Sequence, residues 1–164
     1  MPKKIAIFGG SFNPPGLHHR KLVEFLSPHF DEIVIIPCGP RPDKSSVNDI
    51  KPIHRATMVD LAFRGIPNAR VELFDLELGT FTRTHMLDKI FRVEGEVWHI
   101  IGSDLILNGG RGDSFIHRIW EQGPELWKML NFAIHARGGY DFRQDDLPPK
   151  HHLFDNQIAG SSSE

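Results

Sequence analysis

The sequence has very little cysteine, no long hydrophobic run and no excess of charge. Its single cysteine, Cys38, excludes an internal disulfide and is typical of a reducing compartment. The first apolar run, 5–8, is too short for a secretion signal, and no stretch approaches a membrane span. A formal net charge of −2 gives no global attraction to nucleic acid or anionic membranes. We therefore expect a cytoplasmic protein with no nucleic-acid or membrane partner, whose anion sites are local.

Continuous apolar segments stopped by glycine, proline or polar residues predict strands that are buried on both faces. The clearest are 5–8, 33–36, 97–101 and 132–136, and weaker ones are 71–73 and 152–154. Helical patterns lie between them, from about 18 to 26, 53 to 64, 84 to 93, and from 124 onward. The second is marked by Met58, Leu61 and Ala62, and the inward face expected for the third is Met86, Leu87, Ile90 and Phe91. This alternation predicts an α/β fold, a Rossmann-like parallel sheet with helices on both faces.

We expect one domain over residues 1–164, because no repeat or low-complexity linker divides the chain. Ligands of open parallel sheets bind beyond the carboxyl ends of the strands. Gly9 and Gly10 follow the first predicted strand there, and glycines let a backbone approach a ligand closely. A helix beginning near His18 would offer free N–H groups and a positive dipole end to phosphate. On spacing alone, a glycine turn with solvent-exposed histidines explains the segment equally well.

The segment 9–19 also resembles the GGxFxPxHxGH signature of the HxGH nucleotidyltransferases, most of all that of the nicotinate and nicotinamide mononucleotide adenylyltransferases. The residues that fall on the pattern are Gly9, Gly10, Ser11, Phe12, Pro14 and His19. The first histidine of HxGH is Gly16 here, and the glycine of the motif is His18. The resemblance implies that His19 contacts the ATP phosphates, and it makes His18 the candidate for the missing histidine.

Further segments follow in the order of the family. The loop that ends at Lys44 resembles a Pro-Pro-His-Lys loop whose lysine reaches the acceptor and ATP phosphates, although Asp43 replaces its histidine. The HRxxM pattern is matched from His54. Residues 80–84 resemble a stretch whose backbone contacts the pyridine base, which implies an acceptor contact near Thr82. The alternatives are a solvated surface lysine and a helix N-cap at Thr82 or Thr84.

Two later segments complete the resemblance to a nucleotide site. Gly102 and Asp104 match the family's IGxD, whose aspartate contacts the nucleotide, although aspartate after a strand is also a common turn former. Trp120 lies 17 residues before Arg137, a spacing similar to that of the family tryptophan that stacks on the pyridine ring. The resemblance therefore implies that Trp120 and Arg137 bind the acceptor mononucleotide. Trp127 is the competitor for this role, and its apolar helical neighbours favour a place in the core.

The chain ends in Ser161, Ser162, Ser163 and Glu164, which resemble the start of the family's second signature, ISSTxIR. In the family these serine and threonine groups lie over the ATP phosphates. The isoleucine and arginine that would follow are absent, so we expect a truncated signature. A flexible serine-rich tail is the alternative.

The resemblance implies adenylyl transfer from ATP to nicotinate or nicotinamide mononucleotide, with Mg²⁺ accompanying ATP and no metal held by protein ligands. A homo-oligomer is compatible with this function. Two other functions stay open. Another nucleotidyltransferase of similar size, such as a phosphopantetheine adenylyltransferase, is disfavoured by Trp120 and the turn that begins at Arg137. A non-catalytic nucleotide-binding protein is favoured by Gly16, Asp43 and the missing terminal arginine.

Overall fold

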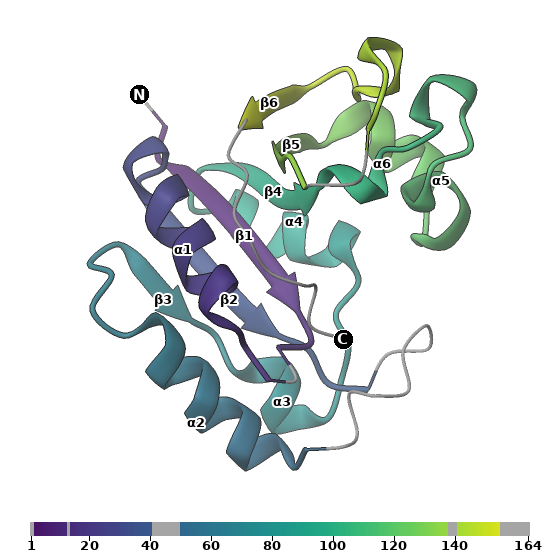
Figure 1. Ribbon diagram of the computed structural model, residues 1–164. Coiled ribbons are helices and arrows are strands. Elements are labelled where there is room, and N and C mark those ends of the chain that lie inside the picture. The colour runs from purple at the N-terminus through teal and green to yellow at the C-terminus, as the bar shows by residue number, and fades with distance from the viewer. Residues whose placement is uncertain (1, 13, 41–49, 138–140, 155–164) are drawn as a thin grey trace. The chain divides into compact units, whose positions relative to one another are not determined.

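The computed structural model describes residues 2–12, 14–40, 50–137 and 141–154 (Figure 1). By their contacts these residues group into two compact units. The N-terminal unit comprises Lys3–Thr82, and the C-terminal unit comprises mainly residues from Arg83 onward. None of the helices in the described ranges is long and apolar enough to cross a membrane.

The N-terminal unit contains three parallel strands in the order β3-β2-β1. They are β1 (Lys4–Gly10), β2 (Glu32–Pro37) and β3 (Ala69–Val71). The helices are α1 (Leu17–Leu26), the 3-10 turn η1 (Ser27–His29), α2 (Pro52–Phe63) and α3 (Phe74–Leu78). The apolar runs of β1 and β2 are fully buried, as their sequence predicts, whereas the third strand ends at Val71 instead of beginning there.

The C-terminal unit repeats the plan with parallel strands in the order β4-β5-β6. They are β4 (Glu96–Gly102), β5 (Asn131–His135) and β6 (His151–Phe154). Its helices are α4 (Thr84–Arg92), α5 (Phe115–Ile119) and α6 (Gly123–Met129), with 3-10 turns η3 (Ser103–Leu105), η4 (Gly109–Arg111) and η5 (Gln144–Asp146). Parallel strands alternating with helices confirm the predicted α/β Rossmann-like class.

The buried face of α2 is not made of the apolar residues that mark this helix in the sequence. Arg55, Val59 and Phe63 are buried, four residues apart, whereas Leu61 is 56% exposed. Residues spaced by four lie above one another on a helix, so a continuous stripe can be buried while apolar neighbours face solvent. Leu61 marks the helix in the sequence but lies outside the buried stripe, which includes a buried arginine that no hydrophobic pattern selects.

The same kind of difference appears on α4. Leu87 and Phe91 are buried as predicted, but Met86 and Ile90 are 43% and 44% exposed. The buried stripe instead includes the acidic residue Asp88. The predicted inward face was therefore right for two residues and wrong for two.

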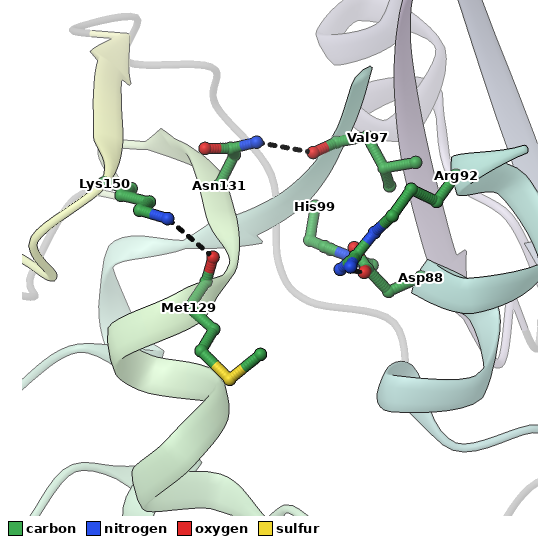
Figure 2. A network of polar contacts seen from close by, with 7 residues as sticks. All are labelled: Asp88, Arg92, Val97, His99, Met129, Asn131 and Lys150. Carbon is green, nitrogen blue, oxygen red and sulfur yellow. Dashed lines mark hydrogen bonds and ion pairs between the residues drawn. The ribbon is translucent and has the colours of Figure 1, made fainter. Parts of the chain in front are cut away.

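Asp88 is buried because it has a partner for its charge (Figure 2). The Nε2–H of His99 in β4 donates to its Oδ1 at 2.9 Å, and Arg92 pairs with its other oxygen. Burial lowers the pKa of His99 to about 3, and the nearby Arg92 cation acts in the same direction. The imidazole is therefore neutral at neutral pH. The neighbouring strand is also tied to β4, since the Asn131 amide donates to the Val97 carbonyl at 3.0 Å.

Candidate functional site

The loop after β1 is shaped by a buried aromatic ring. Phe12 is 2% exposed, and its backbone has a φ of 46°, in the left-handed region that side chains rarely adopt. Its ring packs edge-on against Phe8 and Phe63, with centroids 5.3 and 5.8 Å apart. A Cβ on Gly10 would lie 3.3 Å from this ring, tighter than ordinary contact. Glycine at position 10 therefore lets the chain turn back closely over Phe12.

The guanidinium of Arg55 fixes the loop after β1 through hydrogen bonds to the backbone. Its Nη2 donates to the carbonyl oxygen of Ser11 at 2.8 Å and also to the carbonyl oxygen of Cys38, which follows β2. The Cys38 N–H in turn donates to the Gly10 carbonyl at 2.9 Å. The Ser11 hydroxyl is buried and has no hydrogen-bond partner among the described residues. A buried hydroxyl is usually satisfied, which makes Ser11 a candidate ligand contact.

His19 lies in the first turn of α1, next to this loop. Its Nδ1 accepts a hydrogen bond from the Gly16 N–H at 2.8 Å. Because this nitrogen is the acceptor, the proton of a neutral ring is on Nε2, which becomes the donor. The ring is half-buried and contacts Phe12 edge-on, with centroids 5.1 Å apart. The structure thus presents His19 as an oriented N–H donor at the N-terminus of a helix.

His18 lies directly beside His19. The two ring centroids are 4.0 Å apart, with the ring planes tilted by 38°. The His18 ring also covers Gly16, where an added Cβ would lie 2.6 Å from its Cε1 atom. The structure therefore brings both predicted histidines together at the start of α1.

Thr82 is held by a buried carboxylate instead of capping a helix. The Thr82 hydroxyl donates to Asp75 Oδ1 at 2.6 Å, and its N–H donates to Oδ2 at 2.9 Å. The Thr80 hydroxyl donates to the same carboxylate at 2.8 Å. The N-cap of α4 is Arg83, so the alternative that Thr82 or Thr84 caps this helix was wrong. The Gly39 N–H donates to the Thr80 carbonyl at 2.7 Å, which fixes this loop beside the end of β2.

In the C-terminal unit, the predicted residues gather at the carboxyl ends of β4 and β5. Arg137 Nη1 lies 3.3 Å from Asp104 Oδ1, and the Arg137 N–H donates to the buried Ser103 hydroxyl at 2.9 Å. A Cβ on Gly102 would lie 2.5 Å from Asp104 Oδ1 and 2.6 Å from Arg137 Cδ. A side chain at position 102 would therefore force the Asp104 and Arg137 side chains to move. Sequence reasoning assigned Asp104 and Arg137 to different ligands, whereas here they contact one another.

The two candidate tryptophans differ in burial. Trp127 is 7% exposed and belongs to a hydrophobic cluster with Phe132. Trp120 is half-buried and packs against the same cluster, its ring centroid 6.2 Å from that of Phe132. Trp120 therefore keeps an accessible surface, while Trp127 is a core residue.

Four predicted residues, Lys44 and Ser161, Ser162 and Ser163, lie outside the described residues. Sequence reasoning also missed two residues that support the site. Arg55 is visible only through the HRxxM resemblance, because its contacts join residues 17 and 44 positions away. Asp75 carries no motif, and its partners follow it by five to seven residues. In the described ranges, no group of three or more His, Cys, Asp or Glu side chains gathers as a metal site.

Comparisons with known proteins agree with this geometry. A model of the cytidylyltransferase-like family matches residues 7–163. A probable nicotinate-nucleotide adenylyltransferase of Bacillus pumilus (strain SAFR-032) is 30% identical over 146 residues, which cover 84% of this chain and 71% of that protein. Its counterpart in Aliarcobacter butzleri (strain RM4018) is 29% identical over 145 residues, covering 84% of this chain and 73% of that protein.

A solved structure gives the same result for the fold. Nicotinic acid mononucleotide adenylyltransferase of Plasmodium falciparum, complexed with NaAD, is similar with a TM-score of 0.76 and 25% identity. The similarity covers 98% of this chain and 77% of that one. The chain therefore belongs to the cytidylyltransferase-like family of nucleotidyltransferases, and within that family it is similar to the nicotinate-nucleotide adenylyltransferases.

Proposed function

We propose that this protein transfers the adenylyl group of ATP to nicotinate mononucleotide, producing a dinucleotide and pyrophosphate in NAD biosynthesis. The observation that carries the proposal is the start of α1, where an oriented His19 donor lies beside a glycine loop. The names of the relatives support the substrate class. Because one family model spans residues 7–163, we also propose that the two compact units form one nucleotidyltransferase domain.

In this reaction a phosphate oxygen of the acceptor attacks the α-phosphorus of ATP. One P–O bond forms, the bond to the bridging oxygen of the β-phosphate breaks, and pyrophosphate leaves. No covalent protein intermediate is needed, so the protein acts by positioning the reactants and stabilising charge. We assign this work to the His19 Nε2–H, the first N–H groups of α1 and the Ser11 hydroxyl, which can donate to phosphoryl oxygens.

Magnesium enters this proposal as part of the substrate. Mg²⁺ usually keeps several waters and is held largely by phosphate oxygens when it accompanies a nucleotide. We therefore propose that it arrives as the magnesium complex of ATP and neutralises charge on the phosphates there.

The remaining roles are proposals from the family pattern, supported by local geometry. Gly102 and Asp104 would contact the nucleotide at the end of β4, and Ser161–163 would lie over its phosphates. Lys44 would bind the acceptor phosphate, while Thr82 and Arg137 would help to bind the acceptor. Trp120 would stack on the pyridine ring, since its exposed surface suits a flat base.

The test is dinucleotide formation from ATP with nicotinate mononucleotide, compared with nicotinamide mononucleotide and phosphopantetheine as acceptors. We expect turnover with a pyridine mononucleotide, and a fall of about 10²-fold or more in kcat for His19→Ala, the scale of losing one electrostatic donor. His29→Ala, which removes an exposed imidazole from the same unit, is the control and should leave turnover unchanged. ATP binding by calorimetry without turnover on any acceptor would instead support a non-catalytic nucleotide-binding protein, which the glycine at position 16 favours.

A further inference from the structure

Positions 16 and 18 carry the residues of the HxGH signature in exchanged order. The chain reads Gly16-Leu17-His18-His19, so the glycine and the first histidine of the motif have changed places. In the sequence alone, this exchange removes the histidine that the family pattern places next to the ATP phosphates. The structure shows where the imidazole of His18 goes.

The His18 ring lies in the space where a side chain at position 16 would begin. A Cβ built on Gly16 would be 2.6 Å from Cε1 and 2.7 Å from Nδ1 of His18, both far closer than real Cβ contacts. Gly16 is the N-cap of α1 and His18 is the second residue of the helix. Side chains of a helix lean toward its N-terminus, so a residue at this position reaches back over the N-cap.

Two imidazoles therefore compete for one space at this helix end. A histidine at position 16 would need the space that the side chain at position 18 takes here. Glycine at position 18 would leave that space empty because it has no side chain. The reverse holds in this chain, where glycine at position 16 makes room for the histidine at position 18. In this order the ring of His18 lies beside that of His19, whose Nδ1 accepts a hydrogen bond from the Gly16 N–H at 2.8 Å.

We propose that His18 is a catalytic residue that compensates for Gly16, and that its imidazole binds the ATP phosphates together with His19. The two ring centroids lie 4.0 Å apart, so the two imidazoles are direct neighbours at the start of α1. This inference rests on the proposed adenylyl transfer. The proposed adenylyl transfer requires only that the enzyme tolerates glycine at position 16. The present inference predicts in addition that the substitutions Gly16→His and His18→Gly compensate for each other.

The test is a double-mutant cycle with Gly16→His, His18→Gly and the two together. His18→Gly should lower kcat by about 10²-fold, as for one lost donor, with His18→Ala behaving alike. Gly16→His alone should also lower kcat, because two rings then meet in one space. The double variant should return to within about tenfold of the parent. Leu17→Ala, a 67% exposed side chain of the same turn, is the control.

A double variant no more active than the worse single one would overturn the proposal, as would a His18→Ala chain with parental kcat. Melting temperatures of the same four proteins test the shared space without any turnover. We expect Gly16→His to lower Tm and the added His18→Gly to restore it. If the Tm shift of the double variant equals the sum of the two single shifts, the side chains at positions 16 and 18 do not compete for one space. If the parent makes no dinucleotide but Tm shows this coupling, the adenylyl transfer has failed and the phosphate role of His18 fails with it.

Discussion

The most direct test of how the site is built is to replace Arg55 by methionine. The guanidinium is 2% exposed and donates to two backbone carbonyls, those of Ser11 and Cys38. Methionine fills a similar length but donates nothing, so both buried carbonyls lose a charged donor. Each buried acceptor left without a partner costs about 1–3 kcal/mol, which gives a loss of roughly 2–6 kcal/mol.

That loss is a large share of the stability of a typical domain, which is about 5–15 kcal/mol. For a chain of this size it corresponds to a fall in Tm of roughly 5–20 °C. Thermal unfolding followed by circular dichroism measures it, and calorimetry of ATP binding shows whether the loop loses affinity as well. We expect both to fall, because the Ser11 carbonyl belongs to the loop that we assign to phosphate.

Arg64→Met is the matched control. Arg64 ends the same helix region and forms an exposed ion pair with Asp60 at 2.5 Å, the kind of pair that contributes about 0–1 kcal/mol. The Tm of the Arg64→Met variant should therefore differ from that of the parent by only a few degrees. If Arg55→Met behaves like Arg64→Met in both stability and ATP affinity, the idea that the guanidinium holds the loop is wrong.

Three further predictions concern the C-terminal unit. Trp120→Ala should weaken nicotinate mononucleotide binding by about 1–3 kcal/mol and spare ATP, whereas Trp127→Ala should lower Tm; calorimetry and thermal unfolding would reveal the reverse assignment. Gly102→Ala should displace the Asp104 carboxylate, since the new Cβ would lie 2.5 Å from its Oδ1, and unchanged ATP affinity would argue against that carboxylate as a nucleotide contact. His99 has a pKa lowered from 6.5 to about 3 in the folded chain, so below pH 6.5 only the unfolded chain gains its proton. Stability should then fall by about 1 kcal/mol per pH unit on acidification, and urea unfolding at pH 7 and pH 5 should show a shallower fall for His99→Gln.

The strands could be predicted from sequence because their burial on both faces leaves a continuous apolar run. The runs in β1 and β2 needed no tertiary information, since almost every residue in them is buried. The five-residue helices α3 and α5 could not be predicted, because so short a segment covers little more than one helical turn and shows no repeated hydrophobic spacing. Met86 and Ile90 are exposed, which shows a second limit of prediction from sequence. Hydrophobic spacing identifies one face of a helix, but it does not fix which residues of that face pack against the core.

The local geometry of the candidate site was predictable where backbone conformation favours a particular residue type. Gly10 and Gly102 are the last residues of β1 and β4, and a Cβ at either position would lie unusually close to a neighbouring side chain, so their sequence signal has a direct structural cause. The supporting charges Arg55 and Asp75 were not predictable from the residues alone, because their partners are set by the fold. The contact between Asp104 and Arg137 also depends on which strand ends are neighbours, and no spacing along the chain encodes that.

The ring of Phe12 has a consequence for how a ligand is bound. It anchors a left-handed backbone residue within the hydrophobic core, so core packing holds the backbone at Phe12 in place without any ligand. A preorganised loop loses little conformational entropy on binding, and more of the contact energy appears as affinity. The phosphate affinity that we propose for this loop therefore depends on core packing, and a substitution at Phe63, whose ring packs edge-on against that of Phe12, should alter that affinity although Phe63 is not among the proposed ligand contacts.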